Sequence, residues 1–178
     1  MIETERLRLR PWCEADKPAF RAVVNTPVMM EHFGGVALDA DIEMLLDAQM
    51  ALQARDGHCM WAVETLEGAL AGISGLRVQR TYPGLAVNDQ LEIGWRIGER
   101  WWGQGIAREA AAASIAWGWA NTDFPCILAW TSRANTRSWG LMERLDMNRR
   151  VGLDFAHPRY DPGDPLGAMI VYGIDRPR

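Results

Sequence analysis

A pair of glycines between a strand pattern and a helix pattern constrains this sequence more than any other feature. Gly103 and Gly105 follow the apolar run 91–97 and come just before the alanine-rich stretch 106–120. Glycine lets the backbone approach a ligand closely, and the start of a helix presents free N–H groups and about half a positive charge. The segment therefore predicts a diphosphate site, although the two glycines alone also fit a simple turn between strand and helix.

Two common nucleotide-binding sites do not match this segment. A dinucleotide site of the Rossmann type needs a third glycine where Arg108 stands, and an acidic residue after the next strand, where Thr131 and Ser132 stand. The phosphate loop of nucleoside triphosphatases needs a lysine followed by serine or threonine, which the segment lacks. A diphosphate ligand without a dinucleotide remains.

The rest of the chain alternates strand and helix patterns. We expect one domain, 1–178, because 178 residues is the size of a single domain. Seven strands are predicted, at 5–10, 60–65, 70–78, 91–97, 126–131, 147–155 and 167–174. Four helices are predicted, at 14–25, 39–55, 106–120 and 135–145. This order predicts a mixed α/β (α+β) layered fold.

Charge and composition exclude several classes of protein. The formal net charge of −4 creates no basic field for nucleic acid or an anionic membrane. The longest apolar stretches fall far short of the roughly 20 residues that cross a bilayer, and the first residues lack the pattern of a secretory signal. The three cysteines have no metal or disulfide spacing. We therefore expect a cytoplasmic protein without a metal site that binds neither nucleic acid nor membrane.

The diphosphate segment and its surroundings resemble a known family. The Arg-x-x-Gly-x-Gly motif at 100–105 is similar to the acyl-coenzyme A loop of the GNAT superfamily of N-acetyltransferases, and segments 135–138 and 142–145 are similar to the family's next helix. The branch containing the ribosomal-protein alanine N-acetyltransferases is the most similar, from segment 4–7 to segment 155–159. The resemblance implies a mostly antiparallel seven-stranded sheet with a splayed central strand pair and helices on both faces.

The same resemblance implies acetyl-coenzyme A as the cosubstrate. Its pantetheine arm would bond main-chain groups at Trp95, Arg96 and Ile97, since a splayed strand edge leaves N–H and C=O groups free. Asn135 matches the asparagine that hydrogen-bonds the pantetheine, and it also fits a helix N-cap. The diphosphate would meet the main chain of one continuous segment, with charge added by Arg100: Trp102, Gly103, Gln104, Gly105, Ile106 and Ala107.

Acetyl transfer to an amine needs a proton acceptor for the amine and a proton donor for the departing thiolate. Ser138 matches the serine that the resembled branch places near the thioester sulfur. Glu92, on the strand before the loop, is the first candidate for the base, and His157 and His32 are the fallbacks. Alternation along a strand puts Glu92 on the same face as Arg96, so a solvated charge or an ion pair with Arg96 stays open.

The sequence therefore predicts an N-acetyltransferase that moves an acetyl group from acetyl-coenzyme A to a primary amine by direct attack in a ternary complex. The amine is a protein N-terminus or a small molecule, and the sequence does not decide between them. A non-catalytic module that binds or senses acyl-coenzyme A on the same fold is the alternative, and a nicotinamide oxidoreductase is a third hypothesis. A homodimer stays open.

Overall fold

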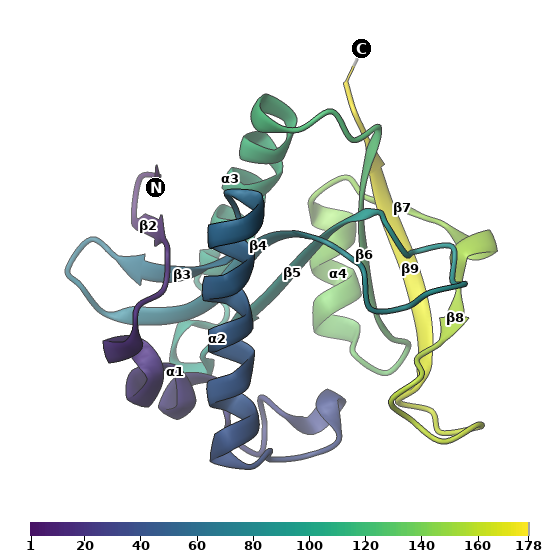
Figure 1. The fold of residues 1–178 in the computed structure, drawn as a ribbon, viewed down its shortest axis with the longest axis horizontal. Coiled ribbons are helices and arrows are strands. Elements are labelled where there is room, and N and C mark those ends of the chain that lie inside the picture. The colour runs from purple at the N-terminus through teal and green to yellow at the C-terminus, as the bar shows by residue number, and fades with distance from the viewer. Residues whose placement is uncertain (178) are drawn as a thin grey trace.

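One sheet runs through the computed structural model, which describes residues 1–177 (Figure 1). Its nine strands are β1 (Ile2–Glu3), β2 (Leu7–Arg10), β3 (Met60–Thr65), β4 (Leu70–Val78), β5 (Leu91–Ile97), β6 (Cys126–Ser132), β7 (Asn148–Arg149), β8 (Phe155–Ala156) and β9 (Ala168–Asp175). The α-helices are α1 (Lys17–Val24), α2 (Asp39–Asp56), α3 (Ile106–Asn121) and α4 (Thr136–Arg144). Single turns of 3-10 helix are η1 (Glu14–Asp16), η2 (Glu31–Phe33), η3 (Glu99–Trp101) and η4 (Val151–Leu153).

The sheet is antiparallel except at its centre. The strand order is β1-β2-β3-β4-β5-β6-β9-β7, with β8 also pairing with β9. β5 and β6 are parallel and pair within residues 1–177 only at Leu91 with Ile127 and at Glu92 with Leu128. Beyond these two positions the strands part, which leaves the main chain of Ile93–Ile97 unpaired on that side. The predicted mixed α/β fold with a splayed central pair is confirmed.

The predicted number of seven strands is wrong, because segment 147–155 is not one strand. It forms β7, the turn η4 and then β8, and the short β1 is added at the start of the chain. Asp154 explains the break. Its carboxylate accepts a hydrogen bond from the Val171 N–H at 3.0 Å, so a side chain takes the place of the main-chain partner that a continuous strand would supply.

The helices cover both faces of the sheet. Figure 1 shows α2 on the near side of the strands and α4 on the far side. Leu91 and Ile93 pack in one core cluster with residues of α3 and α4. Because side chains alternate along a strand, Glu92 and Arg96 point to the opposite face. β5 therefore presents side chains to both faces of the sheet. We call the face toward α3 the loop face and the face toward α2 the opposite face.

The start of the chain is fastened to α3. Glu109 accepts hydrogen bonds from the Thr4 hydroxyl at 2.6 Å and from the Arg6 main-chain N–H at 3.0 Å, and it forms an ion pair with the Arg6 side chain. Arg6 also donates from Nη1 to the Gln104 carbonyl at 2.9 Å. Segment 4–7 thus braces the glycine loop from outside.

Two features are absent from the part of the chain that the structure describes. None of its helices combines the length and the apolar character needed to cross a membrane. Nor do three or more of its His, Cys, Asp and Glu side chains gather in a group that could hold a metal ion.

Candidate functional site

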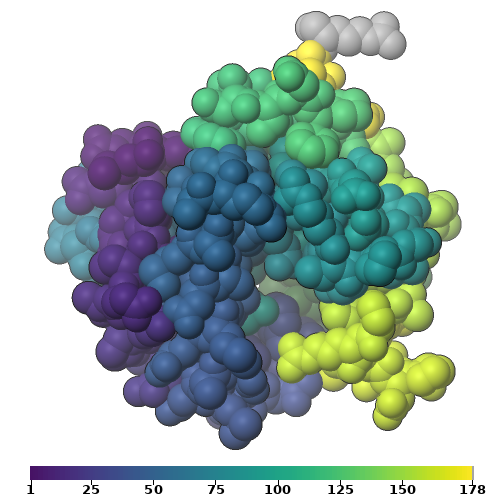
Figure 2. Space-filling model, viewed as in Figure 1, coloured from purple at the N-terminus to yellow at the C-terminus, as the bar shows by residue number. Residues whose placement is uncertain are grey.

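A cavity of about 1040 Å³ lies where β5 and β6 part. Residues from both faces of the sheet line it: the start of α3 and of α4 contribute on the loop face, and η2, β4 and the segment after β8 contribute on the opposite face. In Figure 2 the surface is hollowed between the violet to blue segment of residues 28–45 and the yellow-green segment of residues 155–165. The cavity thus connects the two faces through the gap in the sheet.

The glycine loop has the conformation that the sequence predicts. Gly103 and Gly105 have φ of 72° and 79°, a left-handed region that other residues rarely adopt. A side-chain Cβ at Gly103 would meet nothing within 4 Å, so conformation and not space requires glycine there. Gly105 is the N-cap of α3 and provides no side-chain cap, which leaves N–H groups of the first turn free for a ligand.

Most of the predicted site residues line this one cavity. They are Glu92, Trp95, Arg96, Ile97, Trp102, Gly103, Gly105, Ile106, Ala107, Asn135 and Ser138, together with the fallback bases His32 and His157. Two predicted cofactor residues lie outside its lining. The Arg100 guanidinium sits over the Trp101 ring at 4.5 Å, and the Gln104 side chain donates to the Arg100 carbonyl at 2.6 Å.

The start of α4 is organised by Asn135, and the predicted N-cap is confirmed. Its Oδ1 accepts from the Ser138 main-chain N–H at 3.2 Å, and its Nδ2 donates to Thr131 Oγ1 at 3.0 Å. Both ends of the amide are therefore used within the protein. Ser138 is held one turn into the helix, at the cavity wall.

The ion pair with Arg96 that stayed open for Glu92 is wrong, and so is the solvated charge. Glu92 is buried, and its Oε2 accepts from Arg77 Nε at 2.6 Å and from Gln79 Nε2 at 3.1 Å. The register between β4 and β5 explains why Glu92 pairs with Arg77: Arg77 stands directly opposite Glu92, whereas Arg96 stands opposite Ile73. The Arg96 guanidinium instead lies 4.0 Å from the centre of the Phe33 ring.

His157 belongs to a cluster of aromatic rings on the opposite face, with Tyr82, Trp130, Phe155 and Tyr160. Burial, followed by the charge of Arg159, lowers the pKa of His157 below its ordinary value, so the ring is neutral at pH 7. Nδ1 accepts the Arg159 N–H at 3.1 Å, so the ring proton is on Nε2, which donates to the Tyr82 hydroxyl at 2.7 Å. Neither ring nitrogen is free to take a proton from a substrate in this arrangement.

Several lining residues were missed by the sequence analysis. Ser132 Oγ and Trp101 Nε1 are buried and have no hydrogen-bond partner among residues 1–177, and both residues belong to the cavity lining. Arg77 was missed because its position opposite Glu92 depends on the register of the strands 70–78 and 91–97, which the loop between them does not determine. Tyr82 and Arg159 lie in irregular segments, and no periodic pattern indicates where such residues point.

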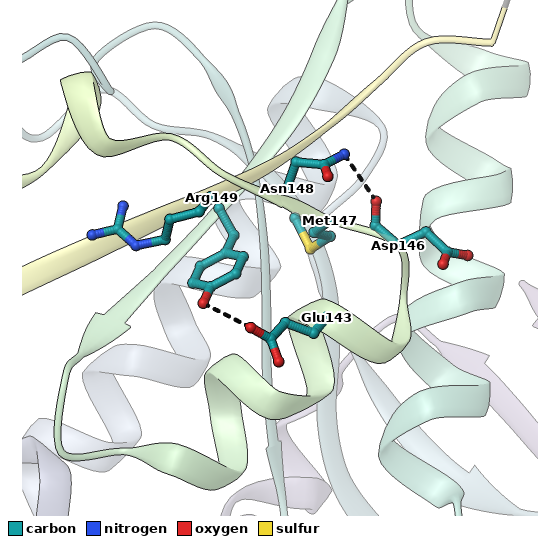
Figure 3. A pocket seen from close by; sticks show the side chains of 6 residues that line it. Glu143, Asp146, Met147, Asn148 and Arg149 are labelled. Carbon is teal, nitrogen blue, oxygen red and sulfur yellow. Dashed lines mark hydrogen bonds between the residues drawn. The ribbon is translucent and has the colours of Figure 1, made fainter.

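A second hollow of about 440 Å³ lies between the end of α4 and β7 (Figure 3). Its polar groups satisfy one another: the Tyr172 hydroxyl donates to Glu143 at 3.2 Å, and the Asn148 amide donates to the Asp146 carbonyl at 3.5 Å. No glycine loop or free helix start adjoins it in the described chain. The cavity between β5 and β6 is therefore the candidate site.

Comparison with known proteins agrees with this geometry. The family model described as "Acetyltransferase (GNAT) domain" matches residues 6–148. The uncharacterized protein YkkB of Bacillus subtilis (strain 168) is 25% identical over 149 residues, covering 83% of this chain and 84% of that protein. An acetyltransferase from Agrobacterium tumefaciens str. C58 is similar in structure, with a TM-score of 0.78, 26% identity and coverage of 97% and 92% of the two chains. RimL, a ribosomal L7/L12 alpha-N-protein acetyltransferase in complex with coenzyme A, is similar in fold, with a TM-score of 0.75, 18% identity and coverage of 97% and 95%.

Proposed function

Because this chain belongs to the GNAT acetyltransferase family and is an acetyl-coenzyme A dependent acyltransferase, we propose that it acetylates a primary amine by direct attack in a ternary complex. The observation that carries this proposal is the cavity that passes through the gap between β5 and β6. The free helix start lies at its loop-face end, and an acidic side chain lies at its other end. Acetyl-coenzyme A and the acceptor amine would enter from opposite faces of the sheet and meet at the gap.

The loop face suits acetyl-coenzyme A. Free N–H groups at the start of α3 would hold the diphosphate, and three arginines near it would balance the phosphate charge: Arg108, Arg137 and Arg144. Arg137 already lies over the Trp102 ring at 4.5 Å. The unpaired edge of β5 at 95–97 would bond the amides of the pantetheine as an added strand would.

The chemistry requires two proton transfers. A neutral amine attacks the thioester carbonyl, the carbon–nitrogen bond forms, and the carbon–sulfur bond breaks with the electron pair leaving on sulfur. Ser138 would donate a proton or a hydrogen bond to that thiolate. Glu92 would accept the amine proton, directly or through water, at Oε1, which accepts no hydrogen bond from residues 1–177. Because both ring nitrogens of His157 are engaged in hydrogen bonds, His157 remains a second choice for the base. His32 is the other second choice.

The alternative is a module that binds acyl-coenzyme A without catalysis. The oxidoreductase hypothesis is wrong, since the family is that of acetyltransferases. The discriminating experiment mixes the protein with acetyl-coenzyme A and amines of several classes and measures free thiol. An acetyltransferase releases thiol only when the right amine is present. Tight coenzyme A binding without thiol release for any class would favour the binding module.

The proposal takes residues 1–178 as one domain, which agrees with the single sheet of residues 1–177. Whether two copies associate stays a prediction, as does the cytoplasmic location. Both are tested on the intact protein, by sedimentation and by fractionation of cells.

A further inference from the structure

The opposite face of the cavity holds more positive charge than the protein neutralises. The three arginines on that side of the lining are Arg77, Arg96 and Arg159, and Glu92 is the single acidic side chain among the described lining residues. Arg77 is paired with Glu92. Arg96 and Arg159 have no carboxylate within ion-pair distance among residues 1–177.

The surroundings of Arg96 make its unpaired positive charge energetically unfavourable. Burial, followed by the positive charges of Arg77 and Arg159, lowers the pKa of Arg96 to about 10, so the side chain is still charged at pH 7. Contact with the face of Phe33 offsets part of the desolvation. A half-buried cation among like charges favours an anion that enters the cavity.

A hydrogen-bond donor stands beside these arginines. The Tyr82 hydroxyl accepts the Nε2 proton of His157, so its own proton is free for another partner. Tyr82 lines the same cavity, and burial, followed by the charge of Glu92, raises the pKa of its hydroxyl, so the hydroxyl keeps its proton at pH 7. Two guanidinium groups and a phenol are a typical set of donors for a carboxylate.

We propose that the acceptor amine carries a carboxylate, which Arg96 and Arg159 bind by charge and to which Tyr82 donates a hydrogen bond. This inference rests on the proposed acetyl transfer. The arginines that would balance the phosphates of the cosubstrate come from α3 and α4 on the loop face, so they do not account for the two on the opposite face; they are Arg108, Arg137 and Arg144. A polyamine acceptor would instead need carboxylates where these arginines stand.

The experiment compares matched acceptors by thiol release from acetyl-coenzyme A. One arm uses amino acids and their carboxamides, a second uses C-terminally amidated dipeptides with aspartate or asparagine at the second position, and spermidine serves as the cationic acceptor. The two arms distinguish a free amino acid from an acidic peptide N-terminus. We expect kcat/KM for the carboxylate member of the preferred pair to exceed that of the amide by about 10-fold to 100-fold. The amine of a carboxamide loses its proton more readily, so amine ionisation would bias the result in the other direction.

Variants assign the effect to the arginines. Arg96→Gln and Arg159→Gln should each raise KM for the carboxylate acceptor about 10-fold or more, and in Arg159→Gln the KM for the amide and the affinity for acetyl-coenzyme A should stay near their original values. Arg159 is exposed, so its variant tests the proposal without a threat to folding. Arg55→Gln, at the exposed end of α2, is the matched control and should change neither value.

Three outcomes decide between the proposals. Thiol release with equal efficiency for acid and amide, or the highest efficiency with spermidine, would overturn the carboxylate acceptor and leave acetyl transfer intact. Loss of acetyl-coenzyme A affinity in Arg159→Gln would overturn it as well, since the Arg159 side chain would then bind acetyl-coenzyme A and not the acceptor. No thiol release with any amine would overturn the proposed function and this inference with it.

Discussion

Ser138 lies at the cavity wall, with its main-chain N–H bonded to Asn135. If its hydroxyl assists the departing thiolate, Ser138→Ala should lower kcat by about 10-fold to 10⁴-fold and change the affinity for coenzyme A little. Steady-state kinetics and calorimetric titration measure the two effects separately. An equal loss of rate and affinity would identify Ser138 as a binding residue instead.

Glu92→Gln tests the proton acceptor. The amide keeps the shape of the side chain but cannot take a proton, so the rate near neutral pH should fall and then recover partly as pH rises and the amine loses its proton unaided. The measurement is the pH dependence of kcat/KM. Glu64→Gln is the control, because Glu64 is also a strand carboxylate paired with an arginine and lies outside the cavity. A Glu92→Gln enzyme with the original rate and profile would exclude Glu92 as the base.

Residues whose roles depend on local conformation were predictable, and those whose roles depend on distant contacts were not. Gly105 and Asn135 are determined by the start of a helix, so a short segment of sequence suffices. The partner of Glu92 depends on the register of β4 and β5, which the long loop 79–90 between them does not determine. The placement of Arg159 depends on how an irregular segment folds back over the cavity.

The glycine loop is the element whose conformation can be tested most directly. Gly105→Val puts a β-branched residue at φ 79°, at a cost of about 1–2 kcal/mol for the left-handed conformation, and crowds the approach to the free N–H groups. We expect weaker coenzyme A binding by calorimetric titration.

Gly57→Val is the matched control for that strain. Gly57 has φ of 75° at the end of α2 and is not part of the cavity lining. Thermal unfolding should register a loss of stability in both variants, whereas only Gly105→Val should lose affinity. Unchanged affinity in Gly105→Val would contradict the role of the loop.

Strand and helix patterns predicted the long elements better than the short ones. The ends of α2 and α3 lie within a residue of those expected, because apolar spacing persists over several turns. β7 and β8 could not be separated from sequence, since the interruption arises from one carboxylate, Asp154, that binds the main chain of a neighbouring strand.

At the scale of the whole molecule, arginine–carboxylate pairs join distant segments and make stability depend on pH. Hydrogen bonds from Arg55, then from Arg80, lower the pKa of Asp56 to about 2, and Arg10 and Arg149 likewise lower the pKa of Asp16 and Asp154. An unfolded aspartate titrates near 3.9, so below that pH the unfolded chain takes up protons that the folded protein resists. The stabilisation is complete above about pH 4 and is lost as pH falls toward 2.

The melting temperature should therefore decrease steadily as the pH is lowered from about 4 to 2, as followed by circular dichroism. Asp56→Asn should start from a lower melting temperature at pH 7 and show a shallower decrease, because one of the titrating carboxylates is gone. A melting temperature that stays constant across this range in the original protein would contradict the contribution of these pairs.

The alternation along β5 also has a consequence for protein engineering. The side chains of Leu91 and Ile93 pack toward α3 and α4, whereas Glu92 and Arg96 line the cavity on the side of the proposed acceptor. Substitution of the Arg96 side chain would therefore change the choice of acceptor, whereas substitution of Glu92 would remove the proposed proton acceptor. Inserting or deleting a single residue in this strand would exchange the two sets of side chains and abolish both specificities together. Transplanting the strand from a relative would carry both preferences across at once.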